Sequence, residues 1–78
     1  MDLPKVLGRN VRRLRKARSA SQEEIAFKSK VNRAYLSDVE RGDRNPTIRI
    51  VGRIARALGV EPAELLVLSS DEKPKRSL

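Results

Sequence analysis

The chain contains no cysteine and no histidine among its 78 residues. These absences exclude disulfide bonds, zinc sites built from Cys and His, and nucleophilic mechanisms that use either residue. No apolar run approaches the roughly 18 residues that a membrane-spanning helix needs, and the first residues lack the apolar stretch of a signal peptide. The lack of cysteine also fits a reducing cytosol. We therefore expect a cytoplasmic protein that holds no metal and no cofactor.

The features of an enzyme are also scarce. No pair of carboxylates lies in an apolar setting, and Ser37 has no histidine in the chain to activate it. The four glycines do not match the spacing of a phosphate-binding loop. We expect the protein not to be an enzyme.

Positive charge dominates the composition. Lysine and arginine total 18 against 10 acidic residues, which gives a formal net charge of +8 and a pI near 10.9. Five arginines fall between residues 9 and 18 with no acid among them. A field of this sign attracts phosphate polyanions before any specific contact forms, so nucleic acid is the expected partner.

Apolar residues recur at helical spacing in several segments, and no strand-like alternation is present. The expected helices span residues 5–18, 22–29, 33–41, 48–58 and 62–68. Ser21, Asn32 and Thr47 are suited to cap the second, third and fourth helices, and Gly42 and Gly59 are suited to end the third and fourth.

The predicted fold class is all-α, with one compact domain of five helices over residues 1–68. From Ser69 the composition becomes polar and charged, so residues 69–78 are predicted to be a disordered tail. A domain of this size lies near the lower limit for a self-sufficient core, and oligomerisation would add stability.

The segment from Gln22 to Glu40 organises the rest of the chain. It contains two short predicted helices joined only by Ser29, Lys30 and Val31, which is the length of a tight turn. Two helices joined in this way form a helix-turn-helix, whose second helix can lie in the major groove of DNA. The segment therefore predicts a DNA-binding surface on its second helix.

The outward side of that second helix carries the candidate base contacts. Leu36 and Val39 are spaced to point inward. The opposite side then holds Arg33, Ala34, Ser37 and Asp38, and Arg41 extends it. Arg33 is suited to the O6/N7 pair of guanine. Asp38 can accept a hydrogen bond from cytosine, or it can orient Arg33 or Arg41 and disfavour wrong sequences.

Four further residues are candidates for contacts with the DNA backbone. Gln22 lies at the N-terminus of the first helix of the pair, where unpaired N–H groups and the helix dipole favour a phosphate. Arg44 and Asn45 follow the second helix, where a loop can track the DNA strand. Tyr35 can pack its ring on the rim of the core and also donate its hydroxyl to a phosphate.

The strings SQEEIAFKS, NRAYLSDVERGDRNPTI, IARALGV and ELL, in this order, resemble the Cro/CI-type helix-turn-helix family of prokaryotic regulators, also called the XRE family. The resemblance covers about residues 5–68 and implies a lambda-repressor-like DNA-binding domain. The string that runs from Arg33 to Thr47 looks closest to restriction–modification controller proteins. The resemblance therefore implies a regulator of transcription.

The resemblance also implies roles for single residues. It implies a buried ion pair between Arg15 and Glu40. It implies base contacts from Arg33, Ala34, Ser37 and Asp38, and backbone contacts from Gln22, Tyr35, Arg41, Arg44 and Asn45. The chain departs from the family pattern at Lys30, where glycine is usual, and at Ser19 and Ala20, which replace Gly-Leu. A left-handed conformation at Lys30 is expected to cost about 1 kcal/mol.

One recognition helix reads too few base pairs for useful selectivity, so a homodimer on a palindromic operator is expected. The apolar run at the end of the last helix is predicted to supply the dimer interface through Leu65, Leu66 and Leu68, together with the end of the fourth helix. The alternative is that this run only completes the core. Such a regulator represses by blocking RNA polymerase or activates by contacting it, and the sequence leaves both open.

Two other functions remain open at this point. One is an antitoxin-type protein-interaction module with secondary DNA autoregulation. The other is nonspecific packaging of nucleic acid, driven by the net charge of +8. A specific regulator keeps a large ratio of specific to nonspecific affinity, whereas nonspecific binding has no such ratio and weakens steeply with salt.

Overall fold

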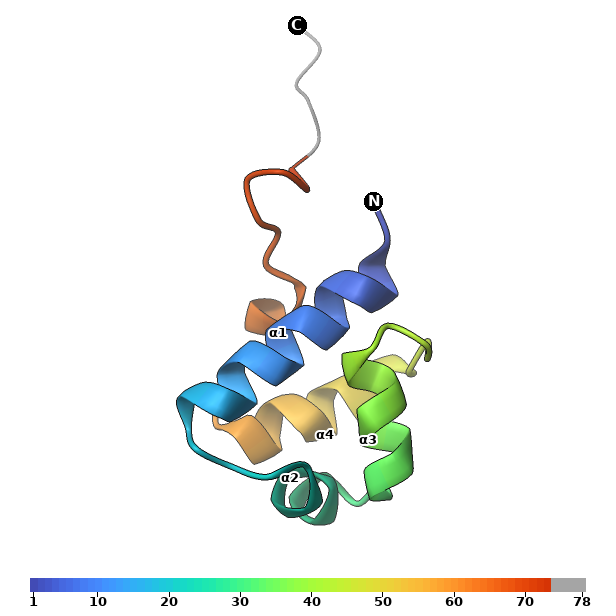
Figure 1. The fold of residues 1–78 in the computed structure, drawn as a ribbon, viewed down its shortest axis with the longest axis vertical. Helices are drawn as coiled ribbons and strands as arrows, with labels where there is room; N and C mark the ends of the chain where they lie inside the picture. The colour runs from blue at the N-terminus through green and yellow to red at the C-terminus, as the bar shows by residue number, and fades with distance from the viewer. Residues whose placement is uncertain (74–78) are drawn as a thin grey trace, which may run out of the picture.

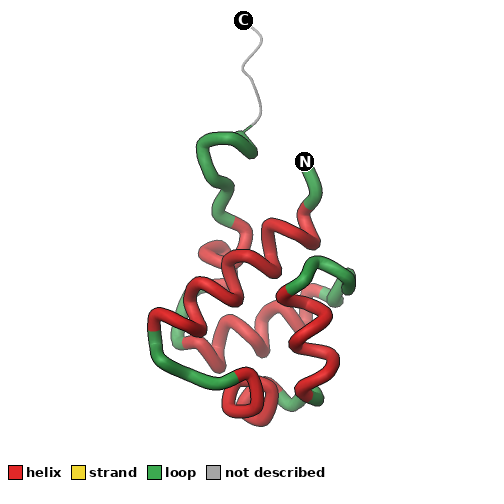
Figure 2. Tube along the Cα trace, in the orientation of Figure 1, coloured by secondary structure: helices red, strands yellow, loops and turns green. Residues whose placement is uncertain are grey.

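The computed structural model describes residues 1–73, and within this range the chain forms four α-helices and one 3₁₀ helix, with no strand. The elements are α1 (Leu3–Ala17), α2 (Gln22–Ser29), α3 (Arg33–Glu40), α4 (Ile48–Leu58) and the 3₁₀ helix η1 (Pro62–Leu66). The all-α prediction is confirmed for this part of the chain. Figure 1 shows α1 and α4 running across the domain, α2 below them and α3 at one edge. Figure 2 shows that short loops join these helices.

Local hydrogen bonds decide where the helices begin. A side-chain oxygen before each α-helix accepts a hydrogen bond from a backbone N–H of the first turn; the residues are Asp2, Ser21, Asn32 and Thr47. The last three caps were predicted. The cap at Asp2 was not, and because of it α1 begins at Leu3 rather than at residue 5. α3 ends at Glu40, with Arg41 as its C-cap. Within residues 1–73, the helices lack the length and the apolar character that a membrane span requires.

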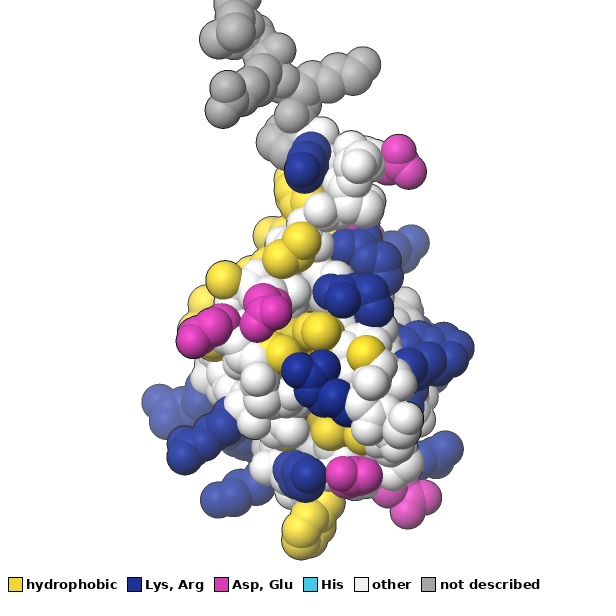
Figure 3. All heavy atoms as spheres, turned by 90° about the vertical axis from the view of Figure 1, so that its left-hand side faces the viewer, with side chains coloured by type: hydrophobic (Ala, Val, Ile, Leu, Met, Phe, Trp, Pro, Cys, Tyr) yellow, Lys and Arg dark blue, Asp and Glu magenta, His cyan; other side chains and the backbone are white. Residues whose placement is uncertain are grey.

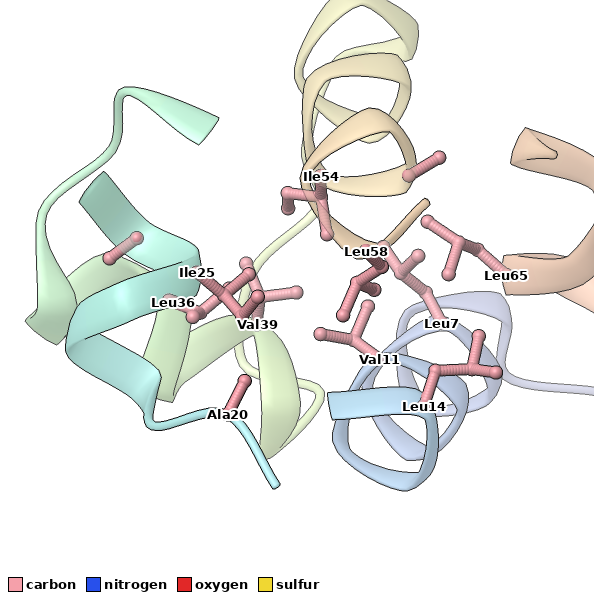
Figure 4. Close-up of a cluster of buried hydrophobic side chains, with 12 residues drawn as sticks. Leu7, Val11, Leu14, Ala20, Ile25, Leu36, Val39, Ile54, Leu58 and Leu65 are labelled. Atoms are coloured by element: carbon pink, nitrogen blue, oxygen red, sulfur yellow. The ribbon is translucent and has the colours of Figure 1, made fainter. Parts of the chain in front are cut away.

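Side chains from every helix meet in one core (Figure 4). The buried members are Leu7, Val11, Leu14, Ala20, Ile25, Ala26, Leu36, Val39, Ile54, Ala55, Leu58 and Leu65. Two of them, Leu36 and Val39, belong to α3 and are completely buried. The core therefore holds α3 by one side and leaves its other side for contacts outside the domain.

The crossing of α1 over α3 is unusually close at Gly8. A Cβ atom at this position would lie 2.3 Å from the carbonyl oxygen of Val39 and 2.6 Å from that of Glu40. Only glycine permits this approach, because any side chain would push the end of α3 away. The sequence did not identify this role of Gly8.

The prediction of a fifth α-helix over residues 62–68 is wrong. The segment forms a 3₁₀ helix that ends at Leu66, and Val67 is extended, with φ −68° and ψ 127°. The buried side-chain amide of Asn10, in α1, donates to the carbonyl oxygens of Leu65 and Val67, each at 2.9 Å. Because α1 supplies these hydrogen bonds, the two carbonyls need no further helical turn to be satisfied.

The predicted tail begins at Ser69, and only its first part lies in the described range. Residues 69–73 form a turn in which the N–H of Ser69 donates to Oε1 of Glu72 at 2.9 Å. Glu72 also pairs with Arg9 of α1. Hydrogen bonds from the Arg9 guanidinium and from the Ser69 N–H lower the pKa of Glu72 to about 2. Residues 74–78 lie outside the described residues, so a domain that ends at residue 68 stays a prediction.

Candidate nucleic-acid interface

The turn between α2 and α3 is held by a side chain from α4. Lys30 follows α2 in the left-handed conformation, with φ 61° and ψ 38°, which disfavours any residue that carries a Cβ atom. Arg53 donates from Nε to the carbonyl oxygen of Ser29 at 2.9 Å and from NH2 to that of Lys30 at 2.7 Å. The guanidinium thus stabilises the turn that Lys30 alone disfavours. No local signal identifies Arg53, because its partners lie 24 and 23 residues earlier in the chain.

The side of α3 that faces away from the core is accessible. Figure 1 shows this helix at the edge of the domain. The four predicted base-contacting residues share its outer side: Arg33 and Ala34 are exposed, and Ser37 and Asp38 are half-buried. The structure therefore brings together the side chains that were expected to meet the bases.

Asp38 lies at the centre of an ionic network at the end of α3. Its carboxylate pairs with Arg41, and with Nε of Arg44 at 3.3 Å. Arg41 also pairs with Asp43 at 3.1 Å. The hydrogen bond to Asp43 and the charge of Asp38 raise the pKa of Arg41. Of the two arginines that Asp38 was expected to orient, it holds Arg41, and within residues 1–73 no ion pair holds Arg33.

Tyr35 and the loop after α3 lie beside this network. The Tyr35 ring is half-buried and packs against the core. The Cζ atom of Arg44 lies 5.2 Å from the centroid of that ring, which is within the range of a cation–π interaction. Arg44 and Asn45 are both exposed in the loop. The loop residues predicted to contact the DNA backbone therefore adjoin the predicted recognition helix.

The structure places Arg15 of α1 in contact with Glu40, the last residue of α3. The two groups form a bidentate pair, with Nε to Oε2 at 2.7 Å and NH2 to Oε1 at 2.9 Å. The side chains are only 11% and 3% exposed. The hydrogen bond to Glu40 raises the pKa of Arg15. Nε2 of Gln22 donates to the same carboxylate at 3.1 Å, so the Gln22 amide, a predicted phosphate ligand, is turned toward Glu40 instead.

The predicted dimer-contact residues differ in accessibility. Leu65 is completely buried in the core, so it is not available to a second copy, and its assignment to the interface is wrong. The 3₁₀ geometry of η1 turns Leu65 inward and leaves its neighbours outside. Leu66 and Val67 are 43% and 52% exposed, and Leu68 is half-buried. The apolar run therefore contributes both to the core and to the surface.

Basic side chains are not confined to α3. Figure 3 shows Lys and Arg side chains on both flanks of the face that it views, with acidic side chains between some of them. Cations therefore lie on more than one side of this view, and positive charge alone does not locate a DNA-binding surface.

Comparisons with known proteins agree with this geometry. The family model described as Helix-turn-helix matches residues 11–65. An HTH-type transcriptional regulator of Sinorhizobium fredii, y4dJ, is 45% identical over 74 residues, which cover 95% of each chain. The control protein C.BamHI of Bacillus amyloliquefaciens is 44% identical over 62 residues, covering 78% of this chain and 76% of that protein. The crystal structure of the restriction-modification controller protein C.AhdI from Aeromonas hydrophila matches with a TM-score of 0.77 and 42% identity, covering 80% of this chain and 94% of that one.

Proposed function

Because the chain belongs to the Cro/CI-type (XRE) helix-turn-helix family, we propose that it is a sequence-specific, double-stranded DNA-binding regulator of transcription that acts as a homodimer on a palindromic operator. One observation carries this proposal: the polar side of α3 is accessible while its apolar side is completely buried. A helix held in this way can enter the major groove as a rigid body. Such a regulator acts in the cytoplasm.

In this proposal Arg33 is the principal reader of the DNA sequence. Its planar guanidinium matches the two acceptors of guanine in the major groove, and no ion pair within residues 1–73 competes for it. Ala34 and Ser37 are small enough to let the helix approach the bases. Asp38 repels phosphate and restrains the neighbouring arginines, so it opposes binding in a wrong register.

The remaining contacts set the position of the helix on the duplex. Arg41, Arg44 and Asn45 approach phosphates at one end of α3, and Tyr35 supports them through its contact with Arg44. At the other side, the first turn of α2 offers unpaired N–H groups to a phosphate beside Gln22. The Arg15–Glu40 pair and the close crossing at Gly8 keep α3 at a constant angle to these contacts.

The homodimer would form through an apolar surface at the N-terminal ends of α1 and α4 and at η1, whereas the sequence led us to expect the end of α4. Ile48 and Leu66 are 88% and 43% exposed there. They border a hollow of about 190 Å³ with no charged residue in its lining, which is Leu3, Pro4, Leu7, Asn45, Pro46, Ile48, Val51 and Leu66. A surface without charged residues is a suitable contact for a second copy, because two chains that each carry a net charge of +8 repel each other and a contact through charged surfaces would add to that repulsion. The exposed Ile48 lies beside this hollow, so in a two-fold dimer Ile48 of each copy could enter the hollow of the other.

Sedimentation of the Leu66→Asp and Ile48→Asp variants tests this interface. Both are expected to shift the protein from dimer to monomer. Phe27→Asp is the matched control, because Phe27 is 83% exposed on α2, outside this surface. A wild-type protein that stays monomeric at the concentrations where it binds its operator would refute the homodimer.

Control of a restriction–modification system is the regulator subtype that we favour. The similarity to C.BamHI over 78% of this chain supports it. RNA polymerase would then be the second partner, blocked from the promoter or contacted from an adjacent site. No feature of residues 1–73 favours the antitoxin-type alternative.

Selection of bound duplexes from a random library tests the function as a whole. We expect a palindromic consensus, bound at least about 10³-fold more tightly than unrelated duplex at the same salt concentration. Arg33→Ala should weaken binding by about 1–3 kcal/mol and relax the preference at one position of each half-site. A library that yields no consensus, with affinity that depends only on salt, would establish nonspecific packaging instead.

A further inference from the structure

Two adjoining hollows lie beside the N-terminus of α3. Of the residues that line them, only Tyr35 was assigned a DNA contact above. The smaller, of about 270 Å³, is lined by Lys30, Val31, Asn32, Tyr35, Ile50 and Arg53. The larger, of about 590 Å³, is lined by Lys28, Lys30, Arg53, Arg56 and Ala57. They share Lys30 and Arg53, so together they form one track that leads from the recognition helix to the C-terminal half of α4.

The charge of this track is of one sign. Four cations line it and no carboxylate does. Among residues 1–73, Glu24 accepts from one of these cations, Lys28, at 3.2 Å across one turn of α2, and both side chains are about half exposed. Surface pairs of this kind contribute little and exchange readily for another anion.

The backbone of the track is held in place. Arg53 binds the carbonyl oxygens of Ser29 and Lys30 at 2.9 and 2.7 Å. These two bonds fix the direction in which the chain leaves α2 and therefore the point from which the Lys30 side chain projects. Lys28, Lys30 and Arg56 are exposed, so their charged groups project into solvent from an ordered backbone and are accessible to an anion.

We propose that this track, defined as the hollows lined by Lys28, Lys30, Arg53 and Arg56, binds the phosphate backbone of the DNA strand that borders the major groove. The inference rests on the proposed function, because the track starts at Asn32, the N-cap of the recognition helix, and at Tyr35 within that helix. A DNA strand carries its phosphates in a continuous row, which suits an extended line of cations. Lys28, Lys30 and Arg56 contact the phosphates, and Arg53 positions Lys30.

The first test compares two triple variants of equal charge. Lys28→Gln/Lys30→Gln/Arg56→Gln removes three cations from the track and keeps Arg53. Arg12→Gln/Arg13→Gln/Lys16→Gln removes three exposed cations from α1. On the selected palindrome, the track variant is expected to bind at least tenfold more weakly than wild type, and the slope of log Kobs against log salt should fall by about 2 to 3. The α1 variant should lose less than threefold. Equal losses in the two variants would overturn the proposal.

The second test locates the phosphates. Duplexes that carry one neutral methylphosphonate at successive positions are bound by wild type, by the track variant and by Arg33→Ala. At the phosphates that meet the track, neutralisation should weaken wild type and Arg33→Ala but leave the track variant unchanged. If the track variant remains sensitive at every phosphate where wild type is sensitive, the proposal is refuted.

The outcomes separate this inference from the regulator itself. If the wild-type protein selects a palindrome and the two triple variants bind it with equal affinity, the track is refuted and the proposed function stands. In the opposite outcome, the wild-type protein selects no palindrome, and of the two triple variants only the track variant binds mixed-sequence duplex more weakly than wild type. That outcome refutes sequence-specific regulation and supports the track. Thermal unfolding of each variant confirms that the fold is intact.

Discussion

Arg15 in α1 and Glu40 at the end of α3 form a bidentate ion pair between residues that lie 25 positions apart in the chain. The same Glu40 carboxylate accepts a hydrogen bond from Gln22 at the start of α2. One nearly buried acidic group therefore joins three helices. The angle of the predicted recognition helix depends on this group as well as on apolar packing.

Arg15→Ala should destabilise the protein by about 3 kcal/mol, because it leaves the Glu40 carboxylate buried without its cation. In a domain of this size that loss lowers Tm by more than about 10 °C. Calorimetry measures the change. Arg13→Ala removes an exposed arginine of the same helix and should change Tm little. Equal Tm values for the two variants would contradict the structural role of the pair.

Gly8→Ala should destabilise the protein by about 1–3 kcal/mol, because the new Cβ would force α1 and α3 apart. DNA affinity should fall with it, since α3 moves. Gly52→Ala in α4 is the matched control: a Cβ there meets nothing within 4 Å, so the change should stabilise by about 0.5–1 kcal/mol. Urea denaturation measures the free energy of unfolding of both variants. If Gly8→Ala were as stable as wild type, the two helices would not cross this closely in solution.

Lys30→Gly should stabilise the fold by up to about 1 kcal/mol, because glycine adopts the left-handed conformation without a steric penalty. Lys30→Ala keeps the Cβ atom and should change stability little. The free energy of unfolding in urea measures both. If Lys30→Gly were the less stable of the two, the turn between α2 and α3 would not have this geometry in solution.

Asp38→Ala should raise affinity for unrelated duplex, on the order of threefold, because Arg41 and Arg44 lose the carboxylate that restrains them. Affinity for the selected operator should not rise as much, so the specificity ratio falls. Asp71→Ala causes the same change of net charge at an exposed position in the turn after η1. A ratio that falls equally in both variants would show that only net charge matters.

The contact between Arg9 and Glu72 makes the turn of residues 69–73 sensitive to pH. The pKa of Glu72 is lowered from 4.5 to about 2, so its stabilising effect is complete above pH 4.5 and is lost as the pH falls toward 2. An NMR titration of the Glu72 carboxyl carbon measures this pKa. Arg9→Gln should return it most of the way to 4.5. An unchanged midpoint in that variant would mean that the pair does not form.

The elements that could be predicted from the sequence are those with local causes. Caps at Ser21, Asn32 and Thr47 act on N–H groups three residues later, and apolar spacing repeats within one helical turn. For the same reason, the outward side of α3 with its candidate base contacts was readable from the positions of Leu36 and Val39. Resemblance to a family then supplied the pair of Arg15 and Glu40, which no local pattern reveals.

The features that depend on how the helices cross became visible only in the folded domain. The side chain of Asn10 in α1 donates to carbonyl oxygens that lie 55 and 57 residues later in the chain. These bonds favour a short 3₁₀ helix over a longer α-helix, and in this 3₁₀ helix Leu65 is buried and Leu66 is exposed. Arg53 reaches back to the turn that holds Lys30. These hydrogen bonds form because folding brings together a donor and an acceptor that are far apart in the sequence. The order of the residues alone does not show which distant residues become neighbours in space.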